Sequence, residues 1–164
     1  MSSAFRYKPG TIVRSLKSTV TVSSGDKSYE VIALWDTGAT SCCVSEDVVE
    51  KLSLIATGKI KMSTTSSECE QADTYMVDLL LPNDILIKDV VVANSKIGAQ
   101  GIGLLVGMDI ITRGDFLITN NRETVFSFRM PSEGTADFVS GIRMLNTIKS
   151  NKKSSNKFKP KRKK

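Results

Sequence analysis

Residues 29–35 form an apolar run rich in β-forming side chains, and this run ends abruptly at Asp36-Thr37-Gly38. Such a run is typical of a strand that is buried on both faces. A carboxylate at the end of a buried strand costs free energy unless it is hydrogen-bonded or has a chemical role. Asp36 is therefore the first candidate functional residue, although Asp-x-Gly alone is also typical of a structural turn.

Short β-rich segments separated by turn residues fill most of the first 130 residues. Alternation and β-branched content predict strands over residues 11–24, 58–64, 74–81, 85–93, 104–106, 116–119 and 124–128. Gly25 and Asp26 indicate a hairpin turn. Short helices are expected over 45–52, with Ser45 as N-cap, and over 108–112. The pattern predicts a mainly-β domain.

The sequence contains no histidine. Serine and cysteine nucleophiles rely on an imidazole to accept their proton, so Ser-His-Asp and Cys-His hydrolysis are excluded. Three cysteines, Cys42, Cys43 and Cys69, are a poor set of zinc ligands and do not suggest a disulfide framework. We interpret them as small apolar residues. Any catalysis must then use carboxylates, lysine or a bound cofactor.

Two further segments accompany the first motif, and together they resemble the retropepsin-type aspartic proteases, in particular the single-domain forms. The matching residues are Asp36-Thr37-Gly38-Ala39-Thr40-Ser41, Leu105-Val106-Gly107-Met108-Asp109-Ile110-Ile111 and Gly114-Asp115-Phe116-Leu117-Ile118-Thr119-Asn120. The resemblance implies a mainly-β, retropepsin-like acid-protease barrel, one lobe per chain, with a short helix after the second motif. It also implies that Asp36 is catalytic, that Thr37, Gly38 and Ala39 form the active-site loop, and that no cofactor or metal is needed. Gly38 and Gly107 lack a Cβ, so the backbone can approach closely around this loop.

The sequence holds only one Asp-Thr-Gly and is too short for two lobes. Aspartic peptidases use two carboxylates that share a proton. The resemblance therefore implies a homodimer in which Asp36 of each subunit activates a water molecule for peptide hydrolysis. Asp109 is an alternative partner within the chain, but it is not followed by Thr-Gly, and we interpret it as structural.

Residues 59–75 occupy the place of the flap that closes over substrate in this family. Ser63, Thr64, Thr65 and Ser66 are candidate substrate-binding residues at its tip, which lacks the glycines that many such flaps carry. An exposed loop is the alternative. Because the flap is unusual, a second function is an alternative. The protein would then be a non-catalytic module that binds extended peptides or proteins.

The chain is divided into four parts by composition. We expect an N-terminal extension over 1–10, the protease domain over 11–130, an amphipathic helix over 131–148 and a disordered basic tail over 149–164. The tail carries nine of the 23 basic residues and no acid, which leaves 14 basic and 17 acidic residues in the remainder. It is predicted either to contact nucleic acid or an anionic surface weakly or to act only as a solubilising tail.

The apolar runs are too short to span a membrane. The first four residues are followed by charge rather than by an apolar segment, so no secretory signal is expected. The sequence therefore predicts a cytoplasmic protein.

Overall fold

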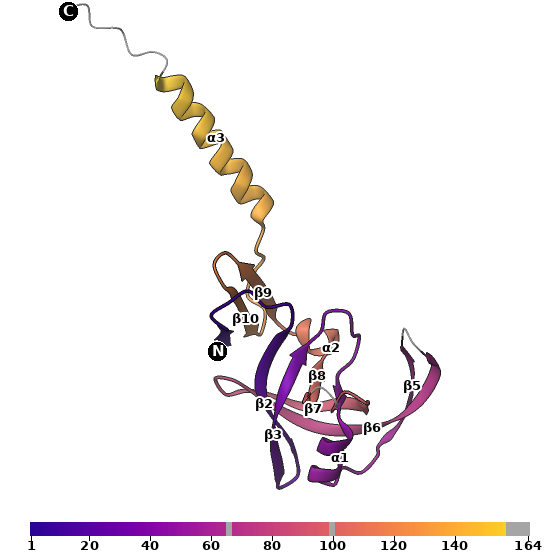
Figure 1. Ribbon diagram of the computed structural model, residues 1–164. Coiled ribbons are helices and arrows are strands. Elements are labelled where there is room, and N and C mark those ends of the chain that lie inside the picture. Colours follow the sequence, from indigo (N-terminus) through magenta and orange to yellow (C-terminus); the bar gives the residue numbers. More distant parts are fainter. Residues whose placement is uncertain (65–66, 99–100, 157–164) are drawn as a thin grey trace, which may run out of the picture. The chain divides into compact units, whose positions relative to one another are not determined.

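The computed structural model of the protein describes residues 1–64, 67–98 and 101–156. They fall into two units, of which the first ends at Glu133 and the second begins at Gly134. The first unit contains the strands β1 Ser3–Tyr7, β2 Leu16–Ser24, β3 Lys27–Trp35, β4 Cys43–Val44, β5 Gly58–Thr64, β6 Ser67–Leu81, β7 Ile85–Asn94, β8 Leu104–Val106, β9 Asp115–Asn120 and β10 Thr124–Met130 (Figure 1). It also contains the short helices α1 Glu46–Leu52 and α2 Met108–Ile111, and the second unit contains helix α3, Phe138–Asn156.

The larger sheet closes on itself as a barrel. Its strands follow the order β2-β3-β8-β4-β7-β6-β5, and β6 also pairs with β2 through Thr21 and Leu80. Six strands therefore form a closed ring, while β5 continues from β6 as the outer strand of a hairpin. Closure removes the free edges that an open sheet of this size would expose. The mainly-β class predicted from the sequence is confirmed.

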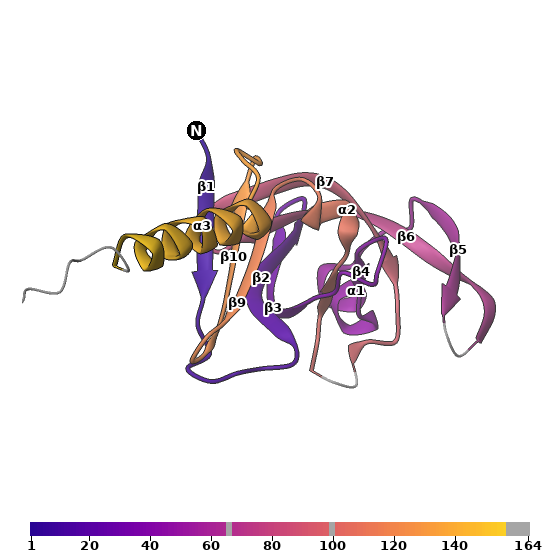
Figure 2. The same ribbon diagram turned by 90° about the horizontal axis from the view of Figure 1, so that it is seen from above.

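A second sheet has the order β1-β10-β9, and all its pairings are antiparallel (Figure 2). Strand β1 pairs with β10 over its whole length, with Phe5 opposite Phe128. Residues 3–7, which lie in the N-terminal extension expected over 1–10, thus form a strand of the first unit. Phe5 is the one buried side chain of this strand, and a single buried position gives no alternation that the sequence could reveal.

Trp35 is the centre of the aromatic core that joins the two sheets. Its ring stacks on Phe116, with centroids 5.6 Å apart and an interplanar angle of 15°, and lies 5.2 Å from Phe128. Its indole N–H donates to the Ser18 hydroxyl at 2.9 Å, so the one polar atom of the ring is satisfied. Trp35, which immediately precedes Asp36, is thus fixed by aromatic packing and by a hydrogen bond.

Strand β3 is buried on one face only, so the expectation of burial on both faces is wrong. Val31, Ala33 and Trp35 point into the core, whereas Ile32 is 40% exposed. A closed barrel has an inner and an outer surface, and side chains alternate between them. Because β3 also carries apolar residues on its outer face, the sequence shows a continuous apolar run instead of an alternation.

Strand β6 begins at Ser67, seven residues before the strand expected at residue 74. Its polar first half pairs with β5, with Gly58 opposite Thr74 and Lys59 opposite Asp73. The Lys59 ammonium lies 3.8 Å from the Asp73 carboxylate. This polar half of β6 is a strand because its backbone hydrogen-bonds to β5. Those bonds do not depend on apolar side chains, so the hydrophobic pattern of the sequence does not predict them.

Helix α3 begins after Asp137, whose carboxylate accepts hydrogen bonds from the backbone N–H of Val139 at 2.8 Å and of Ser140 at 3.4 Å. These bonds are an N-cap. The hydrogen bond from the Ser140 hydroxyl, followed by these two backbone bonds, lowers the pKa of Asp137. The helix starts later than expected and runs to Asn156, into the part predicted to be disordered. The rest of that predicted tail, 157–164, lies outside the described residues.

Within the described chain no helix has the length and apolar character needed to cross a membrane.

Replacing Asp115 with asparagine is expected to lower the melting temperature at neutral pH and to have little effect near pH 2. The Ser132 hydroxyl, the Glu133 N–H and the Arg129 guanidinium all donate to this carboxylate, and they lower its pKa to about 2. A lowered pKa stabilises the fold above the ordinary value for aspartate, and this contribution disappears as the pH falls through the folded-state value.

The measurement is thermal unfolding of wild type and variant across the acid range, with Glu30→Gln on the exposed side of β3 as the matched control. A difference between wild type and Asp115→Asn that stays constant down to the lowest pH would contradict the assignment.

Candidate active site

The segment that follows β3 passes around the end of β8. Strand β8 pairs in parallel with β3, with Trp35 opposite Val106, and antiparallel with β4, with Cys43 opposite Leu105. The chain therefore leaves β3 on one side of β8 and returns as β4 on the other. The backbone N–H of Asp36 donates to the Val106 carbonyl at 3.0 Å, which fixes the start of this loop.

The Asp36 carboxylate is half-buried and held by its own loop. The N–H of Gly38 donates to Asp36 Oδ1 at 2.8 Å, and the N–H of Ala39 donates to the Asp36 carbonyl at 3.3 Å. A Cβ at Gly38 would lie 3.2 Å from the same carboxylate oxygen, a tight contact. Thr37 is exposed beside them. The four residues predicted as the catalytic residue and its loop thus form one turn that orients a single carboxylate.

The second sequence motif holds the far side of this loop. The N–H groups of Met108 and Asp109 donate to the carbonyls of Ala39 and Thr40, at 2.8 Å and 3.1 Å. Gly107 lies so close to the loop that an added Cβ would be 2.7 Å from the Ser41 carbonyl carbon. The predicted close approach at Gly107 is therefore confirmed.

Asp109 connects the two motifs through Cys42. Its carboxylate accepts from the Cys42 N–H at 3.0 Å and lies 3.1 Å from the Cys42 thiol, while the Gly107 N–H donates to the same sulfur at 3.3 Å. Burial, and secondarily Asp109, raise the pKa of the Cys42 thiol far above its usual range, so the sulfur remains protonated and donates to the carboxylate. Asp109 is thus a structural residue, as predicted.

Sequence reasoning missed this role of Cys42, which we had interpreted only as a small apolar residue. The side chain is fully buried, so that part of the interpretation agrees with the structure. Its hydrogen bonds depend on the meeting of two segments far apart in the chain. The one available signal was the carboxylate of Asp109, three residues after the end of the buried strand β8, because a carboxylate in such a place needs donors.

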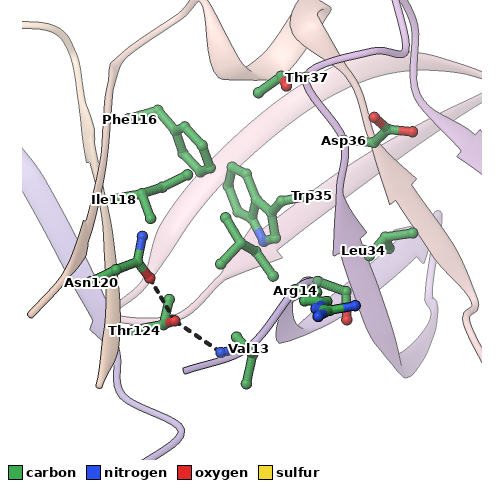
Figure 3. A pocket seen from close by; sticks show the side chains of 12 residues that line it. Val13, Arg14, Leu34, Trp35, Asp36, Thr37, Phe116, Ile118, Asn120 and Thr124 are labelled. Carbon is green, nitrogen blue, oxygen red and sulfur yellow. Dashed lines mark hydrogen bonds between the residues drawn. The ribbon is translucent and has the colours of Figure 1, made fainter. Parts of the chain in front are cut away.

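A groove of about 470 Å³ opens beside the loop (Figure 3). Asp36 and Thr37 lie at one end of it, and Trp35 and Phe116 line its middle. Along β3, Leu34 and Asp36 lie on one side and Trp35 on the other, as strand alternation requires (Figure 3). At the other end the Thr124 hydroxyl donates to Asn120 Oδ1 at 2.7 Å and accepts from the Val13 N–H at 3.0 Å.

The flap candidates lie on the hairpin of β5 and β6. Ser63 and Thr64 are the last two residues of β5, whereas Thr65 and Ser66 lie outside the described residues. At the base of the hairpin the Thr57 N–H donates to the Thr74 carbonyl at 2.7 Å. The role of these four residues in binding substrate stays a prediction.

Comparison with known proteins agrees with this geometry. The sequence model of a family described as aspartyl protease matches residues 19–110, which include both motifs. A search of curated proteins gave no match. A retropepsin-like aspartic protease from Rickettsia conorii has a similar solved structure, with a TM-score of 0.51 and 15% identity, over 79% of this chain and 96% of that one. The foamy viral protease-reverse transcriptase bound to an RNA/DNA hybrid also matches, with a TM-score of 0.42 and 16% identity, over 63% of this chain and 12% of that one.

The chain belongs to the aspartyl protease family, since the family model covers more than half of it. Its fold is that of the retropepsin-like members, with one barrel per chain and a short helix, α2, directly after the second motif. The predicted fold class is confirmed.

Proposed function

We propose that the protein is an aspartic endopeptidase that hydrolyses peptide bonds with a water molecule activated between Asp36 of two subunits. The observation that carries this proposal is the position of Asp36. A single carboxylate ends strand β3, is oriented by the Gly38 N–H at 2.8 Å, and faces solvent in a loop that both family motifs hold. The second motif, distant in the sequence, fixes this loop through backbone hydrogen bonds to Ala39 and Thr40, as expected where the position of one carboxylate matters.

In this mechanism the two carboxylates share one proton, because two negative charges at contact distance are too costly. The ionised carboxylate accepts a proton from water, which attacks the peptide carbonyl. The protonated carboxylate donates to the carbonyl oxygen and stabilises the charge that develops there. The attacking group is water, so neither a covalent intermediate nor a histidine is required.

The second carboxylate comes from another copy of the chain through a two-fold axis. Strand β9 is a candidate part of that interface, because within the described chain it pairs with β10 alone. Leu117 and Ile118 of β9 are each 40% exposed, and Ile118 shares the groove with Asp36. Apolar side chains beside half a catalytic site are well suited to a contact between subunits.

The substrate is proposed to be an extended peptide with an apolar side chain near the cleaved bond. Leu34 and Leu105 are opposite each other across β3 and β8, and both are half-buried. Leu34 lies on the same side of β3 as Asp36 (Figure 3). An apolar surface next to the carboxylate favours an apolar substrate residue at that position.

A mixed peptide library, incubated with the protein between about pH 3 and about pH 7, tests the activity. Cleavage by wild type and none by Asp36→Asn is the expected result. Binding of peptides without cleavage by either protein would replace the peptidase with the peptide-binding module. An active species that sediments as a strict monomer would contradict the shared pair of carboxylates.

A further inference from the structure

Helix α3 carries six large apolar side chains at its surface. Their exposed fractions run from 46% to 67%, and the residues are Phe138, Val139, Ile142, Met144, Leu145 and Ile148. Single exposed apolar residues are ordinary on protein surfaces, whereas several on one helix mark an interaction site.

These side chains follow a helical period. Phe138, Ile142 and Leu145 stand at positions i, i+4 and i+7, so they share one face, and Ile148 continues it by one turn. Ser140 and Arg143 lie on the opposite face. The Asp137 N-cap fixes where the helix begins, so this apolar face is set by the local sequence.

The charge of this part of the chain has one sign. Asp137 is the last acidic residue in the sequence, and residues 138–164 contain ten Lys or Arg. Arg143, Lys149, Lys152 and Lys153 lie within the helix, and the other six follow it in the sequence. A helix with an apolar face and only cationic charge is typical of segments that lie in the interface of a membrane.

Three partners can be compared against these two properties. Nucleic acid would use the positive charge but leave Phe138, Ile142 and Leu145 in water, since phosphate contacts carry such binding. A second copy of α3 would cover the apolar face but would bring two cationic segments together with no acid between them. An anionic bilayer accounts for both the apolar face and the positive charge. Its acyl chains contact the apolar side chains, and its anionic headgroups attract the basic residues.

We propose that α3 binds the surface of an anionic lipid bilayer, with Phe138, Ile142 and Leu145 inserted at the boundary between headgroups and acyl chains. The helix lies along the surface and does not cross the bilayer. Binding does not depend on the Asp36 chemistry, so it holds or fails separately from the proposed peptidase activity.

The experiment is co-sedimentation of the full chain with phosphatidylcholine vesicles, with and without phosphatidylglycerol. Strong binding is expected only to the vesicles that contain phosphatidylglycerol, and it should weaken with salt. Replacing both Ile142 and Leu145 with aspartate is expected to weaken binding at least about tenfold. Replacing both Lys152 and Lys153 with serine should weaken it roughly 25-fold, about fivefold for each lost charge.

Gly141→Ala is the matched control, because a Cβ at Gly141 meets no atom of the described residues within 4 Å and alanine favours the helix. Its binding should equal or exceed that of wild type. Equal binding by wild type and the Ile142→Asp, Leu145→Asp variant would overturn the proposal, since charge alone would then account for it. Failure to bind phosphatidylglycerol vesicles, with salt-sensitive binding to a single-stranded RNA instead, would overturn it in favour of nucleic acid.

Discussion

Peptidase activity in a mixture of wild-type and Asp36→Asn subunits is expected to fall with the square of the wild-type fraction. If each site needs Asp36 from two subunits, only dimers with two wild-type chains are fully active. In an equal mixture of freely exchanging subunits, about a quarter of the dimers meet that condition. Independent monomeric sites would instead retain half of the activity, so the titration separates the two mechanisms.

The Asp36→Asn homodimer itself is expected to lose at least about 10³-fold in kcat, because an amide can neither accept the proton of water nor donate an acidic one. Its fold should be retained, since the asparagine carbonyl can still accept from the Gly38 N–H that donates to Asp36 Oδ1 at 2.8 Å. Asp84→Asn is the matched control. Asp84 is exposed and has a φ of 57°, which asparagine adopts readily.

Steady-state kinetics and thermal unfolding of both variants provide the measurement. Activity that falls in proportion to the wild-type fraction would contradict the shared pair. A kcat near that of wild type in the Asp36→Asn homodimer would show that Asp36 takes no part in the reaction.

Adding a methyl group at Gly107, by the substitution Gly107→Ala, is expected to destabilise the Asp36 loop more than adding one at any other position around it. The backbone at Gly107 has φ −93° and ψ −175°, an extended conformation that alanine adopts without strain. The cost is therefore steric. The new Cβ would lie 2.7 Å, 2.8 Å and 3.0 Å from the carbonyl carbon, oxygen and nitrogen of Ser41, and backbone atoms cannot rotate away.

Displacing Ser41 would also disturb the neighbouring Cys42 and the loop that carries Asp36. We expect a loss of about 3 kcal/mol in the free energy of unfolding, at the upper end for an inserted methyl group, and roughly a 100-fold fall in kcat from a misplaced carboxylate. Chemical denaturation and peptidase kinetics measure the two effects.

Gly98→Ala is the control, because among the described residues its Cβ would meet the Ser45 Cβ at an ordinary 3.4 Å and the more distant Ser45 hydroxyl. It should change stability and kcat little. Equal stability and kcat in wild type and Gly107→Ala would show that the loop does not depend on this close approach.

The predictable parts of the fold are those where local side chains carry the signal. The β-rich runs that became β2, β3, β7 and β8 contain alternating or continuous Val, Ile and Leu, and glycine or polar residues end them. The turn at Asp36 and the close approach at Gly107 were predictable for a related reason, because each follows an apolar run and requires a residue of a particular kind.

The parts that could not be predicted depend on contacts between distant segments. Strand β1 exists because Phe5 packs on Trp35 and Phe126, more than 25 residues away in sequence in both cases. Strand β4 has only two residues and is defined by β7 and β8 on either side. The thiol of Cys42 has partners only once α2 lies against the loop.

Trp35 is the only tryptophan in the sequence, and it stands one residue before Asp36. The residue is 5% exposed, and its ring is stacked on Phe116 and donates a hydrogen bond to Ser18. Light that excites tryptophan selectively therefore reports on one place in the molecule, at the junction of the barrel, the second sheet and the loop that carries Asp36. Because an indole in an apolar site emits at shorter wavelength than one in water, loosening of this junction can be followed optically in the unlabelled protein.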